Sequence, residues 1–139
     1  MSGGFILDQR LADDSLFIGT AEGGQIRLMN DARWPWLLLI PEYGGISQLH
    51  ELDAQDAARV LSSSLAIARA MTNAMPDRRI NIGALGNVVP QLHLHHVLRH
   101  NEDPAWPGPV WGFGDRERYA DDAAETACAR WQSVLSDLI

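Results

Sequence analysis

Residues 91–99, QLHLHHVLR, constrain the fold of this chain more than any other stretch. Polar and leucine side chains alternate from its start, which is the pattern of a strand with one buried face. The polar side chains share one face of such a strand: Gln91, His93 and His95. The leucines share the other: Leu92, Leu94 and Leu98. Two imidazoles two residues apart on a strand lie side by side, so this face predicts a reaction centre.

Turn-forming residues lead into this strand: Asn81, Gly83, Gly86, Asn87 and Pro90. Histidines on strands commonly serve as hydrogen-bonded polar groups, and this interpretation stays open here. A zinc site is a second interpretation, because His-x-His can place two nitrogens on one metal. Asp31, His50 or Asp103 would then complete it, although nothing in their spacing points to a metal. The third interpretation is a catalytic pair of histidines beside a glycine-rich loop.

Length and charge restrict the class of protein. The 139 residues predict a single domain, 1–139, and the 46% hydrophobic content is ordinary for a globular protein. The net charge of −7 argues against a nucleic-acid polymer as partner. No apolar run approaches the ~18 residues of a membrane span, and the N-terminus lacks an export signal. Cys128 is the single cysteine, which fits a reducing cytoplasm and excludes an internal disulfide.

Short strand signals alternate with helical ones. The strands are expected at residues 16–18, 25–29, 37–40, 79–84 and 91–99, with the first two as a hairpin. Asp53 can cap a long helix that Pro76 ends, and a second helix closes the chain near residues 120–138. Apolar residues at helical spacing predict the buried side of the long helix: Ala57, Leu61, Leu65, Ala68, Met71 and Met75. We therefore expect an α+β fold with a mostly antiparallel sheet of about five strands, packed on helices on one side only.

Residues 86–99, GNVVPQLHLHHVLR, resemble the signature of the histidine-triad (HIT) family, Gly-Gln-x-Val-x-His-x-His-x-His. Four residues match it: Gly86, Val89, His93 and His95. Asn87 stands where Gln is usual, and Gln91 replaces the first His. The likeness extends to Asn81, to Asp31 at the family's aspartate and to Trp36 where His is common. Residues 103–112, DPAWPGPVWG, are similar to a bacterial subgroup of HIT-like proteins.

This resemblance implies a HIT-like domain, a homodimer and a small nucleotide as substrate. Family members cleave at an α-phosphate through a nucleotidyl-histidine intermediate, which makes His93 the nucleophile and His95 a donor to a phosphate oxygen. Gln91 cannot titrate but can form hydrogen bonds through its amide. The mechanism requires no metal or cofactor. The alternative is a non-catalytic nucleotide-binding or interaction module with a degenerate triad.

The resemblance also assigns the substrate contacts. The phosphate would be cradled by the loop residues Gly86, Asn87, Val88 and Val89, and Asn81 lies ahead of that loop. Asp31 would accept a hydrogen bond from a ribose hydroxyl, or else cap its own turn.

Three further side-chain types are interpreted structurally. His96 is expected to be buried and hydrogen-bonded. Packing within the loop is favoured for Trp106 and Trp111 over stacking on a base or a dimer contact. Trp34 and Trp36 are expected in the core or an interface, and Cys128 as a small buried hydrophobe.

Overall fold

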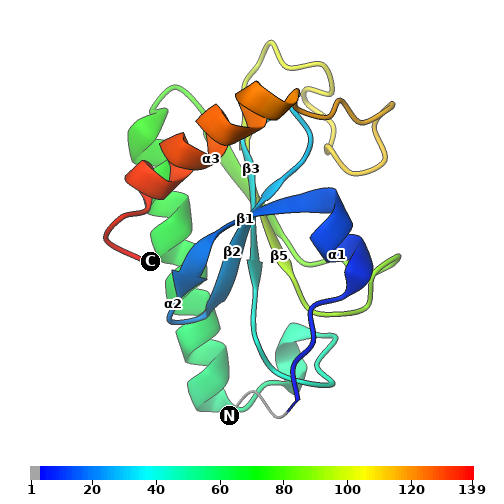
Figure 1. Cartoon of the computed structure of the whole chain (residues 1–139), viewed down its shortest axis with the longest axis vertical. Helices are drawn as coiled ribbons and strands as arrows, with labels where there is room; N and C mark the ends of the chain where they lie inside the picture. The colour runs from blue at the N-terminus through cyan, green and yellow to red at the C-terminus, as the bar shows by residue number, and fades with distance from the viewer. Residues whose placement is uncertain (1–3) are drawn as a thin grey trace.

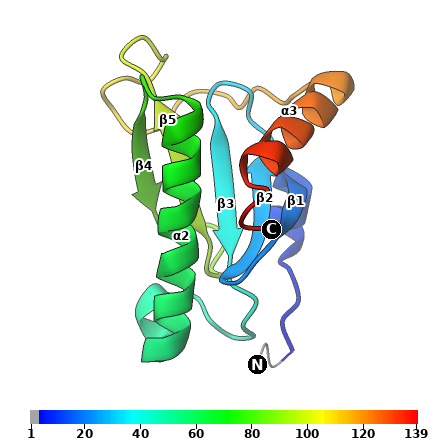
Figure 2. The same ribbon diagram turned by 90° about the vertical axis from the view of Figure 1, so that its left-hand side faces the viewer.

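Five antiparallel strands in the order β1-β2-β3-β5-β4 form the centre of the computed structural model, which describes residues 4–139. The elements along the chain are α1 Gln9–Asp14, β1 Ser15–Ala21, β2 Gly24–Met29, β3 Trp36–Ile40, a 3₁₀ turn Leu49–Glu51, α2 Ala54–Ala74, β4 Arg79–Gly83, β5 Leu94–Arg99 and α3 Asp121–Val134. Figures 1 and 2 show this arrangement in two views. The expected α+β class, the five strands, the hairpin and both predicted helices are confirmed.

Strand β5 begins three residues later than expected. In the β3–β5 ladder the last pair is Leu39 with Leu94, and β3 ends at Ile40, directly before Pro41. Beyond that point the chain has no neighbouring strand on this side, so Leu92 instead donates its amide to the Ile46 carbonyl. His93 therefore lies in the irregular segment that leads into β5. The predicted alternation of faces nevertheless holds, because Leu92, Leu94 and Leu98 lie in the core on the helix side while the rings of His93 and His95 are neighbours.

Helix α2 begins where the sequence predicted, and Ala68 and Met71 are buried as predicted, but the rest of its buried side differs from the prediction. Asp53 accepts a hydrogen bond from the Asp56 amide and caps the helix. The buried residues are Val60, Ser63, Ser64, Ile67, Ala68 and Met71. Leu61 and Leu65, predicted to be buried, are 43% and 50% exposed. The two serines enter the core because each has a partner there: Ser63 Oγ accepts from the Gly23 amide, and Ser64 Oγ bonds to His96.

The expectation that helices pack on one side of the sheet only holds for α2 and α3 but not for the short helix α1. Helices α2 and α3 lie on one face, as the side view shows (Figure 2). A second apolar cluster covers the opposite face, where α1 also packs (Figure 1): Leu11, Trp34, Trp36, Leu38, Ile40, Val97 and Val110. Residues 101–119, between β5 and α3, contain no helix or strand, as their proline and glycine content predicted.

The C-terminal helix is shorter than predicted. It ends at Val134, and the buried Trp131 and Leu135 anchor it against the core shared with α2. Cys128 is half-buried and packs against the same core. Within the described part of the chain, no helix has the length and apolar character needed to cross a membrane.

Candidate active site

His93 lies on the last extended residues before β5, and its side chain is nearly buried, with 8% exposed. Its Nδ1 lies 2.7 Å from the main-chain carbonyl oxygen of Gln91. A carbonyl oxygen can only accept, so Nδ1 carries the proton and donates it to this bond. In the neutral ring Nε2 then holds a lone pair, which is the state a nucleophile requires.

His95 has the opposite tautomer. The indole Nε1–H of Trp36 donates to His95 Nδ1 at 3.0 Å, so the proton of the neutral ring is on Nε2. Burial, reinforced by the nearby His93 and His96, lowers the pKa of His95 to about 3. His95 is therefore neutral at physiological pH. The ring centroids of His93 and His95 are 4.9 Å apart, which confirms that the two imidazoles are neighbours.

Both Nε2 atoms remain available to a ligand. No hydrogen bond to either atom is formed by residues 4–139. Within that range the fully buried side-chain nitrogens without a partner belong to Trp34, Arg78 and Trp111, so neither histidine nitrogen is sealed from solvent. His93 also lines a cavity of about 300 Å³ between the β3–α2 and β4–β5 connections. The neighbouring rings therefore combine one lone pair and one N–H donor, and the ring with the lone pair, His93, lies at the edge of a cavity.

Trp111 closes the far side of His95. Its ring lies edge-on to both His95 and Trp36, with centroids 5.4 and 6.5 Å away. A Cβ on Gly83 would lie 3.2 Å from the Trp111 ring, so the absence of a side chain there admits the indole. Packing was predicted for Trp111, but its contact with a site histidine was not. The loop holding it carries no local signal that fixes where it folds back.

The Gln91 side chain is engaged by the N-terminal segment. Its Oε1 accepts from the Asp8 amide and its Nε2 donates to the Ile6 carbonyl, both at 2.8 Å. Both the oxygen and the nitrogen of the side-chain amide are therefore used in holding residues 6–8. The group of Gln91 that touches a site histidine is its main-chain carbonyl.

The predicted phosphate loop connects β4 to the histidines. Gly86 has φ +71°, a conformation that favours glycine, and it lines the cavity next to His93. Asn87 and Val88 are exposed, and Val89 is half-buried against the second apolar cluster. The loop thus lies beside His93.

Asp31 and Asn81 are both bound to arginines. Asp31, only 2% exposed, accepts hydrogen bonds from the Arg33 guanidinium and amide, and it lies at the opposite end of β3 from His93. Burial acts to raise the pKa of Asp31, but the hydrogen bonds and charge of Arg33 lower it overall. Asn81 Oδ1 accepts from Arg99, which also forms a buried ion pair with Asp103.

These ion pairs involve two of the three side chains that the sequence offered as further ligands of a zinc ion. Asp31 and Asp103 are paired with Arg33 and Arg99, and His50 lines the cavity beside His93 without either of them. No group of three or more His, Cys, Asp or Glu side chains in residues 4–139 is placed to hold a metal ion.

His96 is buried and hydrogen-bonded, as predicted. Its Nε2 lies 2.7 Å from Ser64 Oγ and its Nδ1 lies 3.4 Å from the Leu37 carbonyl. The predictions for two tryptophans are also confirmed: Trp34 and Trp36 are 2% and 6% exposed. The guanidinium carbon of Arg99 lies over the Trp106 ring, 5.7 Å from the centroid of that ring.

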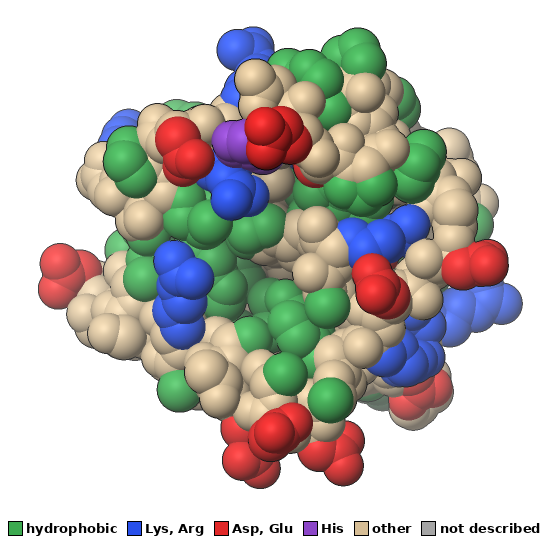
Figure 3. Space-filling view, turned by 90° about the horizontal axis from the view of Figure 1, so that it is seen from above, with side chains coloured by type: hydrophobic (Ala, Val, Ile, Leu, Met, Phe, Trp, Pro, Cys, Tyr) green, Lys and Arg blue, Asp and Glu red, His purple; other side chains and the backbone are tan. Residues whose placement is uncertain are grey.

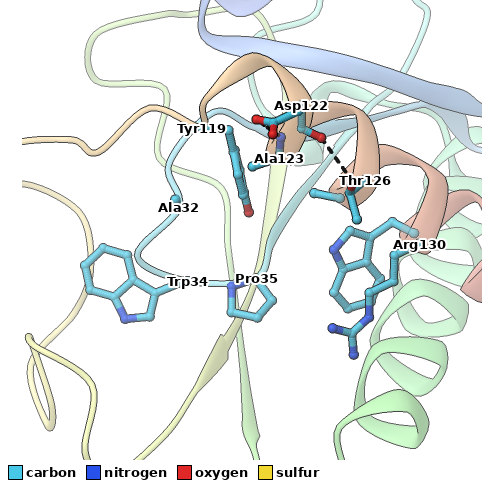
Figure 4. A pocket seen from close by; sticks show the side chains of 10 residues that line it. Ala32, Trp34, Pro35, Tyr119, Asp122, Ala123, Thr126 and Arg130 are labelled. Carbon is cyan, nitrogen blue, oxygen red and sulfur yellow. Dashed lines mark hydrogen bonds between the residues drawn. The ribbon is translucent and has the colours of Figure 1, made fainter.

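A second cavity, of about 420 Å³, lies at the other end of β3. Figure 4 shows Trp34 and Pro35 on one side of it, with Tyr119 and Arg130 opposite. Seen from above, hydrophobic side chains line a hollow in this end of the surface (Figure 3). None of the site histidines lines this cavity.

Comparisons with known proteins identify the family of this chain. A family model described as the HIT domain matches residues 10–102, which include both site histidines and the loop after β4 but not Trp111. The chain belongs to the HIT domain family. Members of this family are generally nucleotide-binding hydrolases or transferases.

Solved HIT structures are similar over nearly the whole chain. A histidine-triad protein of Sinorhizobium meliloti is 45% identical, covering 94% of this chain and 97% of its own, with a TM-score of 0.90. One from Marinobacter aquaeolei is 40% identical over 99% and 100%, with a TM-score of 0.94. One from Bradyrhizobium japonicum is 32% identical over 99% of both, with a TM-score of 0.89. The curated proteins compared with this HIT protein gave no significant match.

Proposed function

We propose that this HIT protein is a hydrolase or nucleotidyl transferase that cleaves a nucleotide derivative at its α-phosphate, with His93 as the nucleophile. The supporting observation is the hydrogen bond from His93 Nδ1–H to the Gln91 carbonyl, 2.7 Å long, which directs a lone pair on Nε2 toward a ligand. Neutral imidazole is a competent nucleophile near neutral pH.

In the first step the Nε2 lone pair forms a bond to the α-phosphorus, and the bond from phosphorus to the leaving group breaks. The leaving group departs with that electron pair and takes a proton from the solvent. The imidazole becomes cationic, and the Gln91 carbonyl stabilises its Nδ1–H. In the second step water or another acceptor attacks the phosphorus and releases a proton to the solvent, the bond from phosphorus to Nε2 breaks, and His93 departs with that electron pair as a neutral ring.

His95 and the loop after β4 would stabilise the charge on the phosphate. His95 Nε2–H is a neutral donor close to the nucleophile, and such donors act strongly in a buried site. The loop through Gly86, Asn87 and Val88 can supply main-chain amides, and Asn87 its side-chain amide. We infer that Gln91 contributes through its carbonyl rather than through its amide, because both amide groups hold residues 6–8.

Asp31 and Asn81 stay predicted substrate contacts. Each already accepts from an arginine in the free protein, so a ribose hydroxyl or phosphate would have to replace one of these hydrogen bonds. The Gln-for-His bacterial subgroup and a cytoplasmic location likewise stay predictions.

A homodimer is the assembly that we expect. β4 forms an edge of the sheet, and α2 contacts it. Both elements expose large apolar side chains, namely Leu61, Leu65 and Ile82. An edge strand beside exposed apolar residues favours pairing with a second copy. Light scattering of the wild-type protein and of Ile82→Glu tests this, since the substitution is expected to shift the mass toward the monomer.

The activity is tested by trapping the intermediate. The protein is mixed briefly with adenosine phosphoramidate or a dinucleoside polyphosphate, quenched, and analysed by peptide mass spectrometry. A nucleotidyl adduct on His93 is expected, and it is absent from His93→Ala. His100→Ala, a change of the same kind outside the cavity, keeps the adduct. Binding of the nucleotide without an adduct or turnover would instead identify a non-catalytic nucleotide-binding module.

A further inference from the structure

Trp36 and His95 form a side-chain pair across two neighbouring strands. In the β3–β5 ladder Leu38 lies opposite His95 and Trp36 opposite Val97, so Trp36 is a diagonal neighbour of His95 on the same face. The ring centroids are 5.7 Å apart, and the indole Nε1 lies 3.0 Å from His95 Nδ1. Trp36 is 6% exposed and His95 is 5% exposed, so water does not compete for this hydrogen bond.

The chemistry of the two groups leaves one protonation pattern. An indole N–H donates and cannot accept, so His95 Nδ1 must hold a lone pair while the bond exists. A proton on Nδ1 would point at the indole hydrogen, and both the other tautomer and the imidazolium carry one there. The remaining neighbours do not replace this constraint: His93 and Trp111 contact His95 through their rings, edge-on.

We propose that Trp36 is a positioning residue, which fixes His95 as the Nε2–H tautomer so that it presents a permanent donor beside the lone pair of His93. The proposal deepens the proposed function and rests on it for its effect on turnover. The two rings then face a substrate with opposite groups on Nε2. His93 offers the electron pair that attacks phosphorus, and His95 offers a proton donor for the phosphate oxygen, with no rearrangement needed on binding.

The tautomer is measured directly in the free protein. ¹⁵N NMR of protein labelled at histidine separates a protonated ring nitrogen from an unprotonated one. Wild-type His95 is expected to show an unprotonated Nδ1 and a protonated Nε2, with coupling across the hydrogen bond from the Trp36 indole. A protonated Nδ1 in the wild type, or no such coupling, would overturn the proposal without any variant.

Trp36→Phe removes the donor and keeps an aromatic ring. We expect His95 to become a mixture of tautomers and kcat to fall roughly ten- to hundredfold, the usual cost of removing a group that orients a functional histidine. KM should change little. Trp34→Phe is the matched control, because Trp34 is an equally buried indole whose Nε1 has no partner in residues 4–139. Trp36→His, which restores an N–H donor, should recover part of the loss.

Two results distinguish this proposal from the proposed function. A fixed tautomer in a wild-type protein without turnover would refute the hydrolase and leave the role of Trp36 intact. A His95 that stays entirely Nε2–H in Trp36→Phe would refute the role of Trp36, whatever the activity. Equal losses of kcat in Trp34→Phe and Trp36→Phe would also refute it.

Discussion

One side of strand β5 faces helix α2 (the helix side), and the other faces Trp36 and Trp111 (the aromatic side). The adjacent histidines on these two sides differ in their hydrogen bonds. His95 and His96 are 5% and 0% exposed, and burial lowers their pKa values to about 3 and about 4. On the helix side His96 uses both ring nitrogens, donating to the Leu37 carbonyl and accepting from the Ser64 hydroxyl. On the aromatic side His95 uses one nitrogen, with Trp36, and keeps the other free.

Burial and a lowered pKa therefore do not identify the functional histidine. Both features follow from removing an imidazole from water, and a structural histidine has them as much as a catalytic one. What differs is whether a polar nitrogen lacks a partner inside the fold. A polar nitrogen left without a partner in a nearly buried side chain is costly to the fold unless a ligand or water uses it.

The largest expected difference between the two sides is in activity. His95→Ala should lower kcat by about 10²- to 10⁴-fold, because it removes a donor to the transition state. Steady-state kinetics with a phosphoramidate nucleotide measures the loss. The double variant Ser64→Ala/His96→Leu, which changes the other side, should retain turnover within about tenfold. Similar losses in both would remove the functional distinction between the two sides.

A buried ion pair on the aromatic side has the next largest effect, this time on stability. Removing one partner leaves the other charge uncompensated, so Asp103→Ala should lower the free energy of unfolding by about 3–5 kcal/mol. Arg99 and Asp103 are 2% and 6% exposed. Urea denaturation measures the change. Asp77→Ala, at an exposed carboxylate beside Arg78, is the control and should stay within about 0.5 kcal/mol.

On the helix side, His96→Ala should lower the free energy of unfolding by about 2–4 kcal/mol, because it opens a cavity and leaves the Ser64 hydroxyl unpaired. Replacing both partners, in Ser64→Ala/His96→Leu, should cost less than His96→Ala alone, since no polar group is then orphaned. If the double variant is the less stable of the two, the hydrogen bond is not what holds His96 in the core.

Acid should reduce stability through both rings. Their folded pKa values lie below the unfolded value of 6.5, so as the pH falls below 6.5 the unfolded chain binds protons that the folded chain does not. The free energy of unfolding should fall by about 1.4 kcal/mol per pH unit for each ring. Urea denaturation between roughly pH 6.5 and pH 4.5, above the titration of Asp103, measures this slope. Ser64→Ala/His96→Leu should lose one ring's share, and an unchanged slope would contradict it.

Local signals predicted much of the fold, and contacts between distant residues set the rest. The alternation through residues 91–99 predicted a strand with His93 and His95 on one face, and Asp53 marked the start of α2. The buried side of α2 was predicted only in part, because Ser63 and Ser64 enter the core through partners at Gly23 and His96. A serine whose hydrogen-bond partner is not known from the sequence is predicted to lie at the surface.

The neighbouring rings of His93 and His95 were predicted from the sequence, and the role of His93 as a nucleophile stays a prediction from the family resemblance. The environment of those rings was not predicted. The indole of Trp36 and the cover by Trp111 depend on the register of β3 and on the course of an irregular loop. The same holds for Asp31. The sequence does not show whether its carboxylate binds a ribose hydroxyl or the guanidinium of Arg33, two residues away.

The missing side chain at Gly83 sets how closely the loop after β5 can approach β4. A methyl group there would lie 3.2 Å from the Trp111 ring, which is closer than ordinary van der Waals contact. A side chain at this one position on the sheet edge therefore presses on an indole that comes from 28 residues further along the chain. In a related sequence with a bulkier residue at the equivalent place, the third histidine of the triad would be more open to water, and its protonation would follow the pH of the medium more closely.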